Sequence, residues 1–550
     1  MPNLKLDALM KKTYFRLNKP TFFLFLGLLI SLSITGCLSS RQAALHIPAE
    51  SGVVLKANLL SLMLKMHHAK GTFREDFSQV AKSSAIPENQ LIGRLQSSGI
   101  NFLRAFMFST FEEDATNYFA LNFPVSNPKK VEPFLKLVFD TLNVQKEGGI
   151  SFFKLSERSI LAWTDEVITY LNMPKSAKFE LPFQKAQAIL TMPEDSSLLM
   201  KNDNYRKLNK VWAEVTVWAN LGRMAQSPGM QKFLSSHEVT KDIKLNNTYL
   251  QSLAHFHRGK MNAQTELFLS EQGHKRYKNL FRPSINPTVL YEAPIGNTPR
   301  GMLALAVNMS EVHTLLEDLH LTDEAQRAAE IVNLPLDQLM AIFSGDVVLF
   351  MEDDTLTQVV SANRQNANPQ KMKRKGPQHN YMIGLGLNSD RTNLDSLINE
   401  LITSSLLVKK EDHYLFFDEY IIIERPDALY ITKVQDKTQQ FAPDPAFGNA
   451  HVRELATKNA LVFYGGRSLI DGLIHRKAVE DDNLLLDLID LPLLYSVFHT
   501  ENLQDNITKG SLATHFTDAD ENSVVIFYNH LKELLFRRNE QINNTHEADR

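Results

Sequence analysis

The sequence contains one cysteine, Cys37, in 550 residues, so no disulfide bond can form within the chain. Its 23 glycines form no glycine-rich loop of the kind that cradles phosphate groups. Nucleophile elbows, Walker loops, Rossmann glycine fingerprints and His-Glu-x-x-His helices are also absent. These absences exclude the enzyme classes that are easiest to recognise from sequence.

The chain also lacks a strong charge of either sign. It has 59 Lys and Arg against 62 Asp and Glu, a formal net charge of -3, so no global field points to nucleic acid or to a strongly acidic substrate. The content of 43% hydrophobic and 22% charged residues is that of a globular protein. The length exceeds what one hydrophobic core accommodates, and we expect two large domains.

An apolar run lies near the N-terminus, where "TFFLFLGLLISLSI" follows a basic stretch that includes Lys11 and Lys12. The run is too short for a comfortable membrane-spanning helix and has the length of the apolar region of a signal peptide. We therefore predict a signal peptide over residues 1–36. Met10 precedes the two lysines and would itself make a typical start, so the true start, Met1 or Met10, stays open.

The residues "ITGC", which end at Cys37, directly follow this run and resemble a bacterial lipobox. In a lipobox the cysteine receives a diacylglyceryl thioether, the chain is cleaved before it, and its new amino group is acylated. Three acyl chains at about 0.8 kcal/mol per buried methylene give permanent anchoring. We therefore predict lipidation at Cys37 and a tether over residues 37–45 that holds the protein on an envelope membrane without spanning it. The alternative is a plain signal peptide with an incidental cysteine.

Six sequence patterns occur twice, in the same order, at an offset of about 250 residues. After the tether, "HIPAESGVVLKANLLSLMLKM" predicts a strand and then a helix, and "PRGMLALAVNMSEVHTLLEDL" from Pro299 repeats that order. Pro-x-x-Gln-Leu occurs at Pro87 and Pro335, and a Ser-Gly pair follows each copy, at Ser98 and Ser344. Six ordered matches do not arise easily by chance, so we predict an internal duplication.

The duplication predicts two related domains, residues 46–295 and 296–537, followed by a polar tail, residues 538–550. Strands come in adjacent groups with short turns, and helices follow in blocks. This pattern favours an α+β fold with mainly antiparallel sheets and packed helices. The predicted helices include residues 204–224, 323–343 and 484–498.

The second predicted domain carries an insertion at residues 361–379 that lacks aromatic and branched apolar residues, and we expect a mobile loop there. The insertion is basic, with four charges between Lys371 and Lys375. A solvated loop is the favoured interpretation, and contact with anionic lipid headgroups or lipopolysaccharide is the alternative.

The segment "IPAESGVVLKANLLSL" resembles the opening of a family of uncharacterised Bacteroidota lipoproteins known only as a domain of unknown function. Members of that family begin with Ile-Pro-Ala-acid after a lipobox and continue into a strand and Asn/Asp-Leu. The matching residues here are Ile47, Pro48, Ala49, Glu50, Val53, Val54, Asn58 and Leu59. The resemblance implies an envelope lipoprotein with a similar layout over residues 46–550, and it implies no catalytic residues because none are established for the family.

The residues after Cys37, "LSSRQAALHIPAE", contain no acidic cluster close to the cysteine. In Bacteroidota-type lipoproteins such a cluster resembles a surface-export signal. Its absence favours the periplasmic face of the outer membrane, and surface exposure is left open. Nucleic acid is not an expected partner outside the cytoplasm.

Two histidines, His255 and His257 in "AHFHRG", would point to one face of a strand and are a feasible half of a metal site. No second pair with ligand spacing is evident. The favoured interpretation is therefore solvated or capping histidines at the end of a helix. We predict no metal and no cofactor.

Clustered carboxylates occur in "FEED" and "MEDD", at equivalent places in the two predicted domains. Their side chains, Glu112, Asp114, Glu352 and Asp354, are of the type that performs acid–base chemistry or binds a cation. Such runs more often mark the end of a strand in water, and this is the favoured interpretation.

Two further motifs have a structural and a functional interpretation. Asp518, Asp520 and Asn522 match the first three ligands of a calcium loop, but the glycine and the closing glutamate of an EF-hand are missing, which favours a hairpin turn. Trp212 and Trp218 lie at helical spacing with neighbouring apolar residues. We expect a core-facing helical stripe there, with a glycan-stacking surface as the alternative.

The sequence therefore predicts a non-enzymatic envelope lipoprotein, anchored to the membrane through Cys37, that binds or scaffolds an unknown envelope protein or glycan. No catalytic residue is assigned. The alternative is an envelope hydrolase or metal-dependent enzyme whose carboxylates and histidines meet only in the fold. A third option is a carrier of lipid or another apolar ligand between the two domains.

Overall fold

A computed structural model describes most of the chain from residue 41 to residue 530. The described residues are 41–67, 98–101, 104–113, 116–138, 143–173, 181–226, 246–294, 301–318, 321–351, 381–417, 419–433, 450–467, 493–500 and 507–530. The predicted signal peptide, Cys37, the insertion 361–379 and the polar tail 538–550 lie outside these residues.

The chain divides into two compact units. Unit 1 takes in the described residues up to Leu60 and those between Val80 and Trp212. Unit 2 takes in the described residues of Ser61–Gln79 and of Ala213–Arg550. This division falls at a different place from the predicted domain boundary at residues 295 and 296, and the predicted domains stay a prediction.

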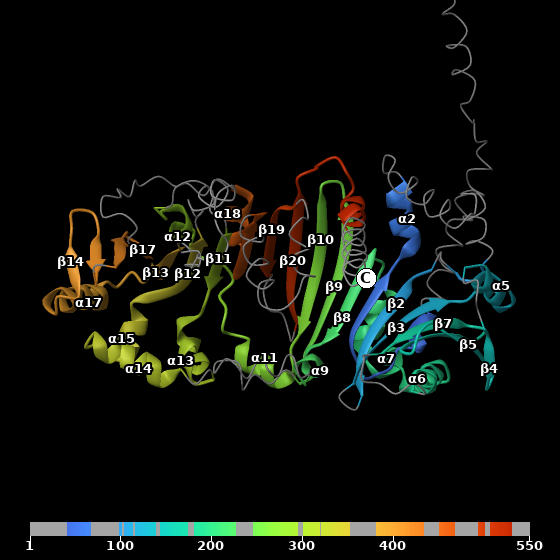
Figure 1. The fold of residues 1–550 in the computed structure, drawn as a ribbon. Helices are drawn as coiled ribbons and strands as arrows, with labels where there is room; N and C mark the ends of the chain where they lie inside the picture. The colour runs from blue at the N-terminus through green and yellow to red at the C-terminus, as the bar shows by residue number, and fades with distance from the viewer. Residues whose placement is uncertain are drawn as a thin grey trace, which may run out of the picture. The chain divides into compact units, whose positions relative to one another are not determined.

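Unit 1 is built on an antiparallel sheet with the order β1-β2-β3-β7-β6-β5-β4 among its described residues (Figure 1). Side chains alternate between its faces, so that Ile150 and Phe152 enter one core cluster and Phe153 enters another. The strands are β1 (Ser51–Ala57), β2 (Phe106–Glu113), β3 (Thr116–Pro124), β4 (Gln145–Glu147), β5 (Ile150–Lys154), β6 (Ser159–Trp163) and β7 (Val167–Asn172).

Helices cover both faces of this sheet. Helix α5 (Pro128–Val138) packs through Val131 and Leu135 on the face that carries Phe153. Helix α6 (Leu181–Leu190) packs through Ala186 and Ile189 on the opposite face, which we call the α6 face. The short elements that follow are η1 (Glu194–Ser196), α7 (Leu198–Lys201) and α8 (Asp203–Lys210).

The strands of unit 2 pair antiparallel in the order β8-β9-β10-β20-β19-β18-β11-β12-β13-β17-β16-β15-β14 among its described residues. The strands are β8 (Val215–Asn220), β9 (Tyr249–His257), β10 (Lys260–Phe268), β11 (Gly301–Ala306), β12 (Phe343–Met351), β13 (Tyr381–Leu387), β14 (Leu407–Lys409), β15 (Tyr414–Phe416), β16 (Tyr420–Glu424), β17 (Ala428–Lys433), β18 (Leu461–Gly466), β19 (Leu493–Thr500) and β20 (Ile507–Phe516).

Among the described residues, helices pack against these strands in several places. Helices α12 (Pro287–Tyr291) and α18 (Ala450–Ala456) join the largest core cluster, and α15 (Leu336–Ala341) and α17 (Thr392–Thr403) join another. Helix α2 (Leu59–His67) and the helix over residues 523–530 contact Phe256 of β9 through a third cluster. The other helices are α9 (Leu221–Gln226), α11 (Glu271–Tyr277), α13 (Met309–Asp318) and α14 (Thr322–Ile331).

The predicted fold class is confirmed at the level of a mixed α+β protein with antiparallel sheets and packed helices. Three predicted helices differ from the structure. Residues 204–224 form α8, β8 and α9, because the alternating "VTVWAN" pairs with β9 as a strand. Residues 323–343 contain two helices with a break between them, and the described end of 484–498 is strand β19.

The two Ser-Gly pairs that sequence analysis matched lie against different turns. Gly99 and Gly345 both have positive φ, +78° and +90°. A Cβ atom at Gly99 would lie 2.1 Å from the carbonyl oxygen of Asn127, which follows β3, and one at Gly345 would lie 2.0 Å from that of Val307, which follows β11. The pairs are therefore not in equivalent places, and this single match does not support the duplication.

The contact at Gly99 predicts an unusually costly substitution. Gly99→Ala adds a Cβ both to a left-handed backbone and to an occupied space, whereas Gly149→Ala, at φ +81°, meets no atom within 4 Å. We expect Gly149→Ala to cost about 1–2 kcal/mol of unfolding free energy and Gly99→Ala at least about 2 kcal/mol more. Guanidinium chloride titration of the full chain measures both values, and equal costs would contradict the prediction.

Candidate functional site

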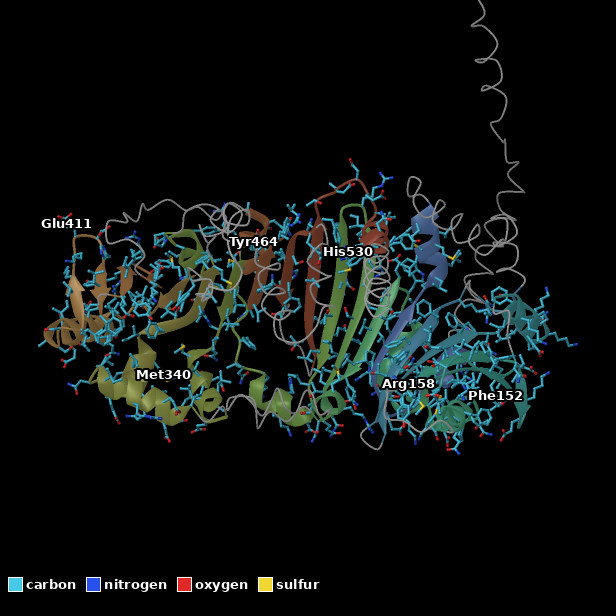
Figure 2. The ribbon with its side chains drawn as sticks, in the orientation of Figure 1. Phe152, Arg158, Met340, Glu411, Tyr464 and His530 are labelled. Carbon is cyan, nitrogen blue, oxygen red and sulfur yellow. The ribbon has the colours of Figure 1, made fainter. Side chains whose placement is uncertain are left out.

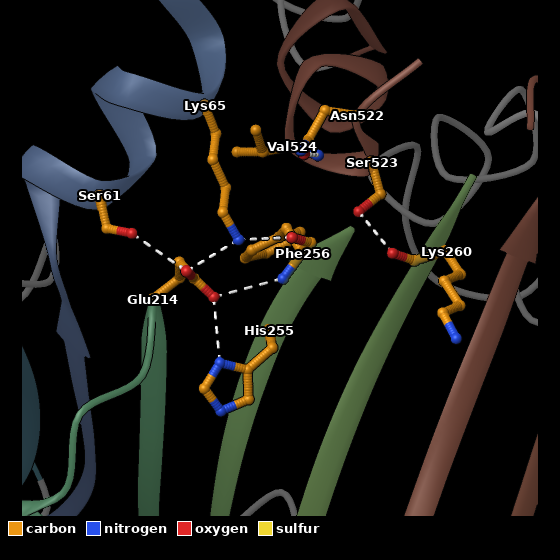
Figure 3. A network of polar contacts seen from close by, with 9 residues as sticks. All are labelled: Ser61, Lys65, Glu214, His255, Phe256, Lys260, Asn522, Ser523 and Val524. Atoms are coloured by element: carbon orange, nitrogen blue, oxygen red, sulfur yellow. Dashed lines mark hydrogen bonds and ion pairs between the residues drawn. The ribbon is translucent and has the colours of Figure 1, made fainter. Parts of the chain in front are cut away.

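A buried carboxylate lies at the start of β8, where Glu214 immediately precedes the strand and its side chain is 1% exposed. Burying a carboxylate is costly unless donors surround it. Figure 3 shows that the donors come from α2 and β9, and all of the residues involved belong to unit 2.

Each carboxylate oxygen of Glu214 has two partners. Oε1 accepts from Ser61 Oγ at 3.0 Å and lies 2.8 Å from Lys65 Nζ. Oε2 lies 3.2 Å from His255 Nδ1 and accepts from the backbone N–H of Phe256 at 3.3 Å. Burial raises the pKa of Glu214, but the hydrogen bonds and charge of Lys65 and the Ser61 hydroxyl outweigh it, so the pKa lies below its ordinary value.

Helix α2 supplies both the polar and the apolar side of this contact. Ser61 and Lys65 are four residues apart and therefore share one face of the helix. Lys65 Nζ also donates to the carbonyl oxygen of Phe256. Leu62 and Met66 pack against the apolar cluster that contains Phe256. The arrangement fixes this helix on β9.

One of the two predicted histidines belongs to the polar group around Glu214. We call this group, which consists of Ser61, Lys65, Glu214, His255 and Phe256, the Glu214 cluster. Both histidines lie in strand β9, not at the end of a helix, and His255 contacts Glu214. His257 is largely exposed, and its partial loss of hydration, together with the charges of Lys65 and Lys260, lowers its pKa. Among the described residues no group of three or more His, Cys, Asp or Glu side chains is placed to hold a metal ion.

Sequence reasoning missed the main members of the cluster. Ser61, Lys65 and Glu214 carry no motif, and about 150 residues separate the helix from the carboxylate. The available signal was an acid directly before an alternating strand, together with Ser-x-x-x-Lys on an otherwise apolar helix. Neither pattern indicates that the two segments meet.

The other predicted site residues are dispersed. Asp114, Glu352 and Asp354 lie outside the described residues, as does the side chain of Glu112. The predicted stripe of two tryptophans is wrong, because Trp218 is buried on β8 at 1% exposure and Trp212 is 62% exposed in the turn before it.

The calcium-like motif forms a turn between β20 and the helix over residues 523–530, not the predicted hairpin turn. Asp518 Oδ1 accepts from the backbone N–H groups of Asp520 and Glu521, both at 3.0 Å. Asn522 Oδ1 accepts from the N–H of Val524 at 3.1 Å, at the start of the helix. These oxygens thus organise the local backbone.

A hollow of about 450 Å³ that is lined mainly by charged residues lies in unit 2 beside the β14–β15 hairpin. Glu411 stands in the turn of this hairpin (Figure 2). The lining combines four basic side chains with three acidic ones, a histidine and an aromatic ring. The lining residues are Arg391, Lys409, Lys410, Glu411, Asp412, His413, Tyr414, Glu424, Arg425 and Pro426.

Part of this lining is fixed by hydrogen bonds. Arg391 forms an ion pair with Glu424 and donates through Nη1 to the carbonyl oxygen of Pro426 at 3.0 Å. The hydroxyl of Tyr414 donates to Glu424 Oε2 at 3.2 Å. Lys409 Nζ lies 6.0 Å from the centre of the Tyr414 ring. Burial and the charge of Glu424 raise the pKa of Tyr414, so its hydroxyl remains a donor at neutral pH.

Comparison with known proteins gives little. No protein-family model matches the chain, and no curated protein matches it. The chain is distantly similar to crystal structures of TP0453. Crystal forms III and I match with TM-scores of 0.26, at 12% and 13% identity, over 42% of this chain and 80% and 79% of that one. Crystal form IV matches with a TM-score of 0.23 and 11% identity over 43% and 84%. Similarity at this level decides nothing about function.

The helices in the described part of the chain include none that is long and apolar enough to cross a bilayer. The predicted relation to the Bacteroidota lipoprotein family stays a prediction.

The Glu214 cluster predicts strong coupling between two side chains. Lys65→Met leaves a buried carboxylate without its cation, and we expect a loss of about 3 kcal/mol of unfolding free energy. This lies at the low end of the range for buried pairs because the Lys65 side chain is 27% exposed. The double variant Lys65→Met/Glu214→Gln should cost about 0.5–3 kcal/mol less than the sum of the single variants. Urea titration of the four proteins gives the coupling, and strict additivity would exclude it.

The same titrations at low pH give an independent check. Because the folded pKa of Glu214 lies below its ordinary value of 4.5, its stabilisation is complete above that pH and is lost as the pH falls through the folded pKa. The wild-type protein should therefore lose stability more steeply than Glu214→Gln in this acidic range. Parallel curves would contradict the assignment.

Proposed function

We propose that the chain is a lipid-anchored protein of a bacterial cell envelope, held through Cys37 on the periplasmic side of the outer membrane, and that it acts by binding another envelope component. The lipobox-like "ITGC" and the apolar run before it support the anchor. The absence of an acidic cluster after the cysteine supports the periplasmic side.

The carboxylate of Glu214 is not placed for catalysis. General acid–base catalysis needs a carboxylate or an imidazole that can reach a substrate. Glu214 is 1% exposed, and its two oxygens are used by α2 and β9. The enzyme alternative requires the four carboxylates of "FEED" and "MEDD" to gather with the histidines, and it stays a prediction. These carboxylates are Glu112, Asp114, Glu352 and Asp354.

We propose that the hollow beside β14 binds the ligand, and that the ligand is an acidic glycan of the envelope. Its exposed lysines Lys409 and Lys410 offer cations to carboxylate or phosphate groups. The hydrogen bonds among Arg391, Glu424 and Tyr414 fix these three lining side chains before a ligand binds. This lowers the entropic cost of binding.

We also propose that the sheets arose by the predicted internal duplication. Within unit 1 the strands pair in the order β1-β2-β3-β7-β6-β5-β4. Within unit 2 seven strands pair in the matching order β11-β12-β13-β17-β16-β15-β14. The meanders β8-β9-β10 and β18-β19-β20 follow these sets along the chain, and this repeated topology supports a common origin.

The anchor is tested on the protein purified from membranes. We expect the mature wild-type chain to begin at Cys37 and to carry the mass of three acyl chains, and we expect Cys37→Ser to lose that mass and to leave the membrane fraction. Intact-mass spectrometry and detergent phase partitioning measure the two effects. A wild-type chain without acyl mass would refute the anchor.

The ligand is tested by calorimetric titration of the lipidated protein, in detergent, with soluble fragments of peptidoglycan, an acidic glycan that lies in the periplasm. We expect Lys409→Ala/Lys410→Ala to weaken binding about tenfold or more, since a hydrogen bond to a charged group contributes about 1.5–3 kcal/mol. Added salt should weaken the wild-type binding as well.

The matched control is Lys129→Ala/Lys130→Ala, which removes the same charge from two exposed lysines of unit 1. It should keep the wild-type affinity. An equal effect of both double variants would show a nonspecific charge interaction, and undetectable binding by the wild type would reject the glycan.

A further inference from the structure

The N-terminal segment that follows the predicted lipidation site is firmly placed on unit 1. Ala43, Ala44 and Ile47 are fully buried. The carbonyl oxygen of Ile47 accepts from the N–H of Leu198 in α7 at 2.9 Å. His46 lies in the same stretch, where its Nδ1 is 3.1 Å from the carbonyl oxygen of Ile189 in α6. The segment is therefore part of the α6 face.

This placement limits how far unit 1 can move from the bilayer. Arg41 is the first described residue, and its guanidinium lies 3.9 Å from Glu194 in η1. Cys37 is four residues earlier, and four residues span at most about 14 Å. An acylated Cys37 would thus hold the backbone of Arg41 within about that distance of the lipid headgroups, and η1 lies beside the Arg41 side chain.

Exposed apolar and basic side chains occur close together in sequence on the elements that directly follow η1, namely α7, α8 and the turn after α8. Met200, Val211 and Trp212 are 40%, 41% and 62% exposed. Lysines flank them in α7 and α8. We define the Trp212 patch as Met200, Lys201, Lys207, Lys210, Val211 and Trp212, all of them exposed residues of unit 1.

Helix α8 presents this patch on the same side of the sheet as the anchored segment. Its buried Tyr205 donates to Met107 Sδ at 3.8 Å, and Met107 shares the α6 face with Phe111. Lys207 and Lys210 are three residues apart and form the basic last turn of α8, immediately before Val211 and Trp212.

This chemistry is that of a membrane interface. A tryptophan places its apolar ring among acyl chains and its N–H at the headgroups, and lysines extend their ammonium groups towards anionic phosphates. We propose that the Trp212 patch docks on the surface of the bilayer that holds the lipid anchor, with anionic lipid as its partner. The inference rests on the proposed anchoring at Cys37.

The chain contains its own probe for this docking. Of its three tryptophans, Trp163 and Trp218 are 4% and 1% exposed. The difference in fluorescence emission between the wild-type protein and Trp212→Phe therefore reports the environment of the Trp212 ring. The full lipidated protein is reconstituted into phosphatidylcholine vesicles that contain phosphatidylglycerol, with and without bromine atoms on the acyl chains.

We expect brominated chains to quench the Trp212 emission and the membrane to protect it from aqueous acrylamide. Lys207→Ala/Lys210→Ala should lower the quenching to the level found in vesicles of phosphatidylcholine alone. The matched control is Lys129→Ala/Lys130→Ala, which removes two exposed lysines from α5 on the opposite face of the sheet and should leave the quenching unchanged.

Flotation of the vesicles separates the two possible failures. Protein that floats with the vesicles but keeps an unquenched, acrylamide-accessible Trp212 would overturn the docking inference and leave the anchor intact. Protein that does not float would refute the anchor and, with it, the docking that depends on it. Equal loss of quenching in both lysine variants would also overturn the proposed patch.

Discussion

The burial of Glu214 is the constraint on which this part of unit 2 depends. A carboxylate that is 1% exposed is tolerated only while hydrogen-bond donors and a cation replace the hydration that it has lost. The four donors come from α2 and β9, so the helix and the strand must both be in place. Asp346 on β12 obeys the same rule, with Arg282, Ser344 and the N–H of Asn286 as its donors.

Much of the strand layout followed from local sequence, since alternation and turns are short-range signals. The prediction failed where one pattern fits two structures. Leu208, Val211 and Trp218 have helical spacing, yet the β-branched run from Val215 to Val217 favours a strand, and pairing with β9 decided the outcome. The end of the predicted helix over residues 484–498 is also a strand. It forms β19, which pairs with β18 on one side and with β20 on the other.

The candidate sites were predictable only where their members are close in sequence. His255 was found through its neighbour His257, whereas Glu214 had no local signal and its partners lie in a distant helix. The hollow near β14 was missed for a related reason. Its basic side chains meet because the β14–β15 hairpin, the start of α17 and the β16–β17 turn converge. The charged run in the hairpin carries no net signal, because Lys409 and Lys410 are balanced by Glu411 and Asp412.

The strand order also explains why the C-terminal segment matters to unit 2. Strand β10 pairs with β20 over nine residues, although the two strands are far apart in the chain. After β20 the chain returns to the turn between β9 and β10. There the N–H of Gly259 donates to the carbonyl oxygen of Glu521 at 2.8 Å, and Ser523 Oγ donates to the carbonyl oxygen of Lys260 at 2.9 Å. Without this segment, β10 and β19 would each expose a row of unpaired backbone N–H and C=O groups. Such an exposed edge can pair with another chain and cause aggregation. The last described strand thus links the meander that carries the Glu214 cluster to the part of the sheet that carries the hollow.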